Sequence, residues 1–180
     1  MMHTSKSQVD KKHRSTLKKT QTTDIVEILL EDHKPLKVLI KMMKDSKLKF
    51  KEKRDVFEEF AQTLMVHSKS EEETLYTALK KMDALREAGY EGDVEHRLAD
   101  HLINEIKNTE DEVLCAARIK VLAELVEHHL KEEEEELLPD FKKNSESHER
   151  EILGDRFLQI KVNYLANGNG ISSFIQKLMS

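Results

Sequence analysis

The spacing of apolar residues is the feature that most constrains how this chain can fold. Around the segment VEHHLKEEEEELLPDF, residues 126–141, one stripe with steps of three or four residues contains Leu122, Val126, His129, Glu133 and Leu137. Residues at this spacing share one face of an α-helix. His129 and Glu133 therefore face the core about 6 Å apart along the helix axis. Burying both is costly unless a cation or hydrogen bonds satisfy them, and a metal ion would do so.

The same pattern occurs a second time, in the segment HSKSEEETLYTAL, residues 67–79. Glu71 follows His67 at the fourth place, as Glu133 follows His129. The surrounding stripe again has helical spacing and consists of Phe57, Phe60, Leu64, His67, Glu71, Leu75, Ala78, Met82 and Leu85. Two His-x-x-x-Glu pairs in the middle of apolar stripes favour metal ligands over chance pairs on a helix surface.

Composition indicates an all-α fold. The 180 residues are enough for one domain with a sizeable core. Only five Gly and two Pro are present, 36% of the residues are charged and 5% are aromatic. These values are typical of long amphipathic helices and not of a sheet with its turns and β-branched runs.

Several classes of protein are excluded by the same composition. The single cysteine, Cys115, rules out an intramolecular disulfide and an iron–sulfur cluster, and it fits a reducing, cytoplasmic setting. A net charge of −5 gives no reason to expect nucleic acid binding. No apolar run is long enough for a membrane span, and no secretory signal is present. Residues 1–22 are rich in Lys, Arg, Ser and Thr and are predicted to be a disordered basic tail.

The first predicted helix begins near Thr23 or Asp24, where Asp24 and Glu27 have the spacing of a capping box, and it ends at Asp45. Its apolar stripe includes His33. The second helix is expected from about residue 48–51 to Ala88, with Gly89 as its stop.

The third helix is expected over residues 93–108, where helical geometry leaves His96 and His101 as alternatives for the inward position. A capping box of Thr109 and Glu112 opens the fourth helix. A shorter helical pattern follows over residues 148–165.

Four helices with short connections predict an up-down-up-down antiparallel four-helix bundle over residues 23–144, followed by a C-terminal helical extension over residues 145–180. Each of the four helices then offers inward nitrogen or oxygen atoms: His33; His67 and Glu71; His96 or His101; His129 and Glu133. These donors are too many for one four-coordinate zinc ion. They suit two ions of octahedral type, with iron as the first choice by ligand type and manganese as the alternative.

These residues resemble the hemerythrin-like, or HHE cation-binding, family over about residues 24–142. The matching segments are LLEDH with His33, HSKSEEETLY with His67 and Glu71, VEH with His96, and VEHHLKEEEEELLPDF with His129 and Glu133. The resemblance implies that the four histidines are terminal ligands and that the two glutamates bridge a non-haem di-iron centre. The family's oxygen carriers have a second histidine four places after the first on the third helix, where this chain has Asp100. Their fourth-helix carboxylate lies five places after the histidine, which would select Glu134.

Three functions follow as hypotheses. The first is a di-iron protein that binds or senses a small ligand such as O2 or NO, or that handles iron and peroxide. The second is a di-iron oxidoreductase that acts on peroxide or another small substrate. The third is a metal-free helical interaction protein with structural histidines. An electronic spectrum separates the third from the others, since an apo bundle has no metal absorption.

Overall fold

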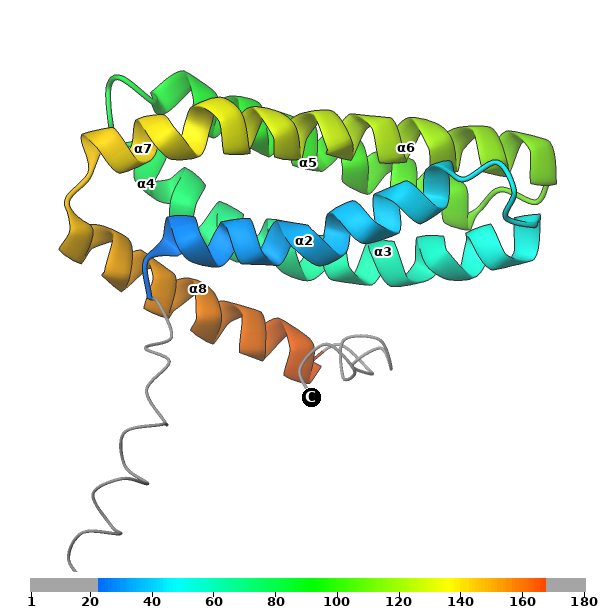
Figure 1. The fold of residues 1–180 in the computed structure, drawn as a ribbon, viewed down its shortest axis with the longest axis horizontal. Helices are drawn as coiled ribbons and strands as arrows, with labels where there is room; N and C mark the ends of the chain where they lie inside the picture. Colours follow the sequence, from blue (N-terminus) through cyan, green and yellow to red (C-terminus); the bar gives the residue numbers. More distant parts are fainter. Residues whose placement is uncertain (1–22, 168–180) are drawn as a thin grey trace, which may run out of the picture.

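The computed structural model describes residues 23–167. Of these residues, 87% are helical and none lies in a strand. The prediction of an all-α fold is therefore confirmed, and the arrangement is consistent with a helical bundle (Figure 1). The predicted basic tail, residues 1–22, and the chain after residue 167 lie outside the described residues.

Four long helices carry all the sequence-predicted ligands except Glu133: α2 (Ile25–Lys44), α3 (Phe50–Glu71), α5 (Arg86–Lys107) and α6 (Glu112–Glu132). Helix α3 continues into a π-helical turn, η1 (Glu72–Tyr76), and a short α4 (Thr77–Leu79). Helix α6 likewise continues into a π-helical turn, η2 (Glu133–Leu137), and α7 (Leu138–Asn144). The last helix, α8 (Ser147–Asn167), spans the region where a shorter helix was predicted.

The start of α2 agrees with the prediction. Asp24 is the N-cap, and its side chain accepts a hydrogen bond from the backbone N–H of Val26 at 3.0 Å. Such a bond satisfies one of the free donors at a helix start. The helix runs through Pro35 and reaches its C-cap at Asp45.

The predicted end of the second helix is wrong. The chain leaves the helix after Leu79 and starts α5 at Arg86, so Gly89 lies inside α5 and does not stop a helix. A Cβ atom at Gly89 would lie 3.0 Å from Cβ of Leu79. Glycine at this position therefore lets α5 approach α4 closely, and the third helix begins earlier than predicted.

The predicted cap of the fourth helix is also wrong. Asp111 is the N-cap of α6, and its side chain accepts a hydrogen bond from Leu114 N–H at 2.7 Å. The Thr109 hydroxyl instead donates to the carbonyl of Glu105 at 2.6 Å, at the end of α5. Asp and Thr are both good caps, so the sequence alone did not distinguish them.

The helices pack both against sequence neighbours and against segments distant in the sequence. Helix α2 contacts α3 and α6, α5 contacts α6, and α8 lies along α2 and α3 (Figure 1). The buried apolar side chains form two clusters. The larger includes Leu36, Leu64 and Val126, and the smaller includes Leu29, Leu75 and Leu138. The predicted ligands His33, His67 and Glu133 fall between these positions in the sequence, so a polar layer separates two apolar ones.

None of the helices within residues 23–167 combines the length and hydrophobicity that a bilayer span requires.

Candidate metal centre

The two copies of the His-x-x-x-Glu pattern have the same local structure. Glu71 is the last residue of α3, immediately before η1, and Glu133 is the first residue of η2. Each histidine lies one turn earlier, on α3 or α6. The internal repeat of the sequence is therefore also a structural repeat, and single π-helical turns inside α-helices are frequent at functional sites.

The structure brings the six predicted residues together in the buried layer. His33, His67, Glu71, His96, His129 and Glu133 are each at most 3% exposed. Glu71 Oε2 lies 3.3 Å from His67 Nε2 and 3.7 Å from His96 Nε2. Glu133 Oε2 lies 3.5 Å from His33 Nε2 and 3.6 Å from His129 Nε2. Each carboxylate is therefore shared between two histidines from different helices.

These side chains form two groups in which the potential ligand atoms lie within 4.8 Å of one another. One group is His33, His67, Glu71 and Glu133, and the other is Glu71, His96 and His129. Glu71 belongs to both groups. The Nε2 atoms of His96 and His129 lie 3.1 Å apart in the second group.

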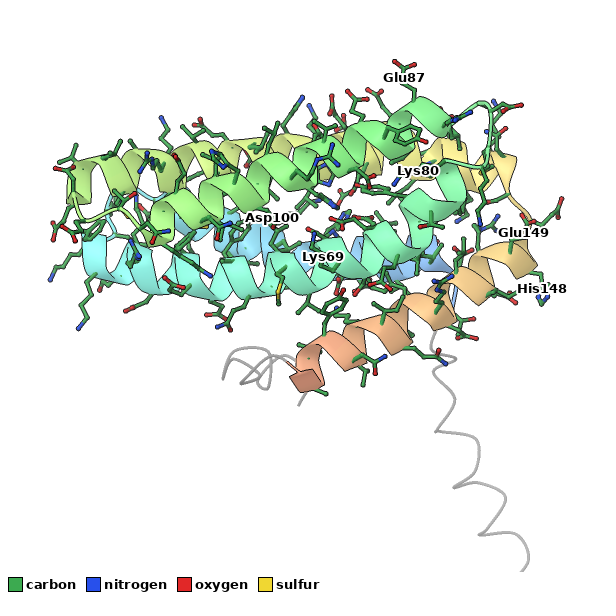
Figure 2. All side chains as sticks on the ribbon, turned by 180° about the vertical axis from the view of Figure 1, so that it is seen from behind. Lys69, Lys80, Glu87, Asp100, His148 and Glu149 are labelled. Carbon is green, nitrogen blue, oxygen red and sulfur yellow. The ribbon has the colours of Figure 1, made fainter. Side chains whose placement is uncertain are left out.

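The alternatives from the sequence lie elsewhere. His101 is 72% exposed on its side chain and pairs with Glu105. Asp100, four places after His96, has a side chain that is 41% exposed. Its Oδ2 atom lies 3.3 Å from Nζ of Lys69, in an ion pair between α3 and α5 (Figure 2). Glu134 does not reach the centre directly, because its carboxylate binds His33 Nδ1 and Lys37 on the outer side.

Every central histidine has a carboxylate on its outer nitrogen. The Nδ1 atoms of His33, His67, His96 and His129 bind Glu134 at 3.0 Å, Asp32 at 3.1 Å, Glu72 at 3.2 Å and Glu95 at 2.7 Å, respectively. An ionised carboxylate can only accept a hydrogen bond, so Nδ1 donates and Nε2 is the nitrogen that faces the centre. This carboxylate–histidine arrangement is the one that orients imidazoles bound to a metal.

Helical spacing alone did not predict these outer carboxylates as partners of the histidines, although a simple pattern marks them. Each is adjacent in sequence to a central residue but binds the histidine of another helix. Asp32 precedes His33 and binds His67, while Glu95 precedes His96 and binds His129. Adjacent residues point about 100° apart on a helix, so the neighbour of an inward residue is directed towards the next helix.

Tyr76 is a further residue whose position was not predicted, because sequence spacing alone indicates core packing. Its hydroxyl donates to Glu133 Oε1 at 2.6 Å and lies 3.4 Å from Nε2 of both His96 and His129. A Cβ atom at Gly92 would lie 2.4 Å from Tyr76 Cζ, so this glycine makes room for the ring. In the other copy of the repeat, the position equivalent to Tyr76 is Leu138. A tyrosine in place of this apolar residue was the available sign that the position does more than pack in the core.

Several central atoms are buried without a hydrogen bond among the described residues: His33 Nε2, His67 Nε2, both Glu71 oxygens and Glu133 Oε2. Buried polar atoms in folded proteins normally have partners. These atoms converge on the same small volume, and a cation would satisfy them together. The imidazole and carboxylate donors present fit iron or manganese.

Burial and neighbouring charges set the ionisation of the centre. Burial raises the pKa of Glu133, and the negative charge of Glu71 raises it further. Burial would also raise the pKa of Glu71, but the interactions with His67, His96 and His33 together outweigh this effect and lower the pKa to about 2. Burial would lower the pKa of His129, but Glu133 and Glu95 outweigh it and raise the pKa to about 9. Burial and the charge of His67 lower the pKa of His33 to about 4.

Among the comparisons with known proteins, the one with family models gives a match. Searches of curated proteins and of solved structures find no match. The family model of the hemerythrin HHE cation binding domain matches residues 24–141, which include all six central residues and the helices that carry them. This chain therefore belongs to the hemerythrin HHE cation binding domain family.

Proposed function

We propose that this protein holds a non-haem di-iron centre and uses it to bind or sense a small ligand such as O2 or NO, or to handle iron and peroxide. The supporting observation is the set of buried Nε2 and carboxylate atoms that converge without hydrogen-bond partners among the described residues. Membership in a cation-binding family supports the same reading.

In this proposal His33, His67, His96 and His129 are terminal ligands, and Glu71 and Glu133 are shared between two ions. The support is that each carboxylate lies between two imidazoles. The bound iron would supply redox chemistry and open coordination positions, and manganese is the alternative metal. We take the four long helices as an up-down-up-down antiparallel bundle over residues 23–144, with a helical extension after it.

One observation favours the second candidate, a di-iron oxidoreductase that acts on peroxide or another small substrate. The Tyr76 hydroxyl lies inside the centre and donates to Glu133. Burial and the charge of Glu133 raise the pKa of Tyr76 well above its usual value, so the phenol keeps its proton. A protonated phenol at this place can donate a hydrogen bond to a substrate bound at the centre.

A spectroscopic experiment tests the proposal. Metal-free protein is loaded with Fe2+ without oxygen, and its absorption is followed after addition of O2, NO or peroxide. Binding or sensing predicts a reversible change in the near-ultraviolet and visible absorption with O2 or NO. Catalytic loss of peroxide supports the oxidoreductase. Failure to take up stoichiometric metal would support the metal-free interaction protein.

A further inference from the structure

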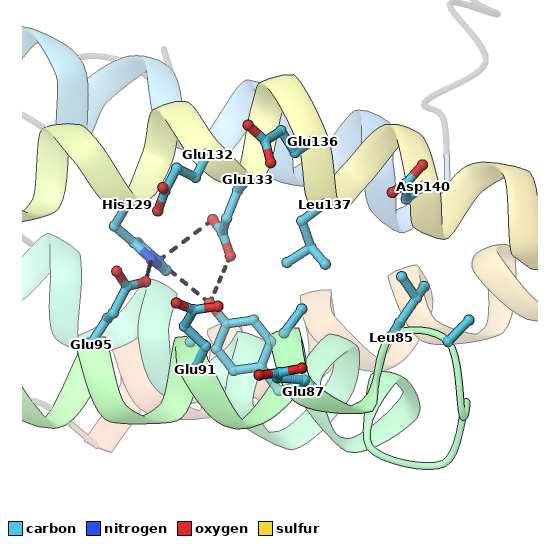
Figure 3. A pocket seen from close by; sticks show the side chains of 14 residues that line it. Leu85, Glu87, Glu91, Glu95, His129, Glu132, Glu133, Glu136, Leu137 and Asp140 are labelled. Atoms are coloured by element: carbon cyan, nitrogen blue, oxygen red, sulfur yellow. Dashed lines mark hydrogen bonds and ion pairs between the residues drawn. The ribbon is translucent and has the colours of Figure 1, made fainter.

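An acidic cavity connects the surface of the protein to the candidate centre. It has a volume of about 350 Å³ and lies between α5 and the η2–α7 segment (Figure 3). Its inner end is formed by Tyr76, His129 and Glu133, which are at most 3% exposed. Its outer walls include the exposed residues Glu87 and Glu91. The cavity therefore reaches from solvent to the central carboxylate.

Apart from His129 at its inner end, the charged side chains around the cavity are carboxylates. Five exposed carboxylates surround its mouth: Glu87 and Glu91 from α5, and Glu132, Glu136 and Asp140 from the opposite wall (Figure 3). Glu95 and Glu133 lie deeper. No lysine or arginine of the described chain lines the cavity. By contrast, a second cavity, next to Glu134, is lined by Lys37, Lys41, Lys44 and Lys131 as well as carboxylates.

Most of the mouth carboxylates have no cationic partner. Within residues 23–167, Glu87, Glu91, Glu136 and Asp140 form no ion pair, although many exposed glutamates of this chain pair with lysine. Like charges lining one concave surface create a negative potential that attracts cations and raises their rate of association.

A separate observation at the inner end points to the same kind of ligand. Glu133 Oε2 is fully buried, has no hydrogen-bond partner among the described residues and belongs to a side chain that lines the cavity. A hydrated cation that passes the mouth would meet this oxygen as a direct ligand. The cavity volume corresponds to about ten water molecules, which is enough for a divalent ion with its inner water shell.

We propose that this cavity is the route by which a divalent metal cation reaches the centre, and that Glu87, Glu91 and Glu136 capture the hydrated ion before Glu133 binds it. The route has a role only if the centre takes up metal, so it rests on the proposed function. Carboxylate oxygens suit this task because they bind hard divalent cations and replace water in the hydration shell.

The test separates the rate of metal uptake from the final amount bound. Metal-free protein is mixed with Co2+, and the visible absorption of bound cobalt is followed by stopped flow. The test variant is Glu87→Gln/Glu91→Gln/Glu136→Gln. The control, Asp55→Asn/Glu110→Gln/Asp155→Asn, removes the same charge from exposed positions that do not line the cavity.

The test variant is expected to load roughly tenfold more slowly at low ionic strength, within the range known for electrostatic steering. The difference should shrink in about 1 M salt, where screening acts over about 3 Å. The final cobalt content and the rate of the control should match those of the wild type.

Three results would overturn the proposed route. The test variant could load at the wild-type rate, the control could slow equally, or the final metal content of the test variant could fall together with its rate. If the wild type itself binds no stoichiometric metal, the proposed function fails and the route fails with it. If the wild type binds metal and only the rate prediction fails, the proposed function stands.

Discussion

Replacing Glu133 by glutamine should stabilise the metal-free protein and remove its response to metal. The Glu133 side chain is almost fully buried, and burial together with the charge of Glu71 raises its pKa from 4.5 to about 7. A carboxyl whose pKa is raised in the fold destabilises the folded state as the pH rises above its unfolded pKa, because the unfolded chain ionises more easily, and the cost is complete above the raised pKa. At about 1.4 kcal/mol for each pKa unit, ionised Glu133 costs about 3 kcal/mol at pH 8.

Glutamine has the same shape, keeps an oxygen that accepts from Tyr76 and never ionises. At pH 8, metal-free Glu133→Gln should therefore gain about 3 kcal/mol, which raises Tm by about 6–12 °C in a chain of this size. The wild type should gain about 2.7 kcal/mol for each bound ion with metal at 100 times its Kd. The variant, which lacks the shared anionic ligand, should gain little.

Thermal unfolding followed by circular dichroism, with and without Co2+, measures both effects. The matched control is Glu135→Gln, two places along the same glutamate run, where the side chain is 62% exposed and lies 3.8 Å from Lys131. It should behave like the wild type, because exposed ion pairs contribute little. A metal-free Glu133→Gln protein that is less stable than the wild type, or that keeps the full metal response, would refute the reasoning.

Three further predictions concern the surroundings of the centre. His96→Ala should lose most bound metal by elemental analysis while His101→Ala keeps it, and the opposite order would contradict the placement of the third helix. Lys161→Met removes the cation that pairs with Asp32, the carboxylate that orients one central imidazole. Competition with a chelator should show that this variant binds metal more weakly than the wild type, by up to about tenfold. An unchanged affinity for metal would count against a positioning role of Lys161. Metal binding should release protons at pH 7, because His129 has its pKa raised to about 9 and must lose its proton to bind. Calorimetry in buffers of different ionisation enthalpy measures this release of protons. The affinity for metal should also rise with pH. An affinity for metal that does not change with pH would contradict the predicted proton release.

The inward positions were predictable because helical spacing alone determines which residues face a core. His33, His67 and His129 each occupy an apolar stripe, and the structure buries all three. The choice between His96 and His101 was not predictable, since each lies at an edge of the same apolar arc. The structure buries His96 and exposes His101.

Other features depend on contacts between helices and were not predictable from spacing. The chain leaves the helix after Leu79 without a glycine or proline there, and α4 and α5 then pack closely at Gly89. The π-helical turns η1 and η2, next to Glu71 and Glu133, were not predicted either. The position of Tyr76 against Glu133 depends on space left by Gly92.

Metal stoichiometry is the most direct test that the buried histidines and glutamates form a metal centre. Protein expressed with added iron and freshly purified should be analysed for bound metals, next to the variants His67→Ala and His129→Ala. We expect two metal ions per chain in the wild type and loss of most metal in both variants. Wild-type protein without stoichiometric metal, or variants with the full wild-type content, would contradict the proposed centre.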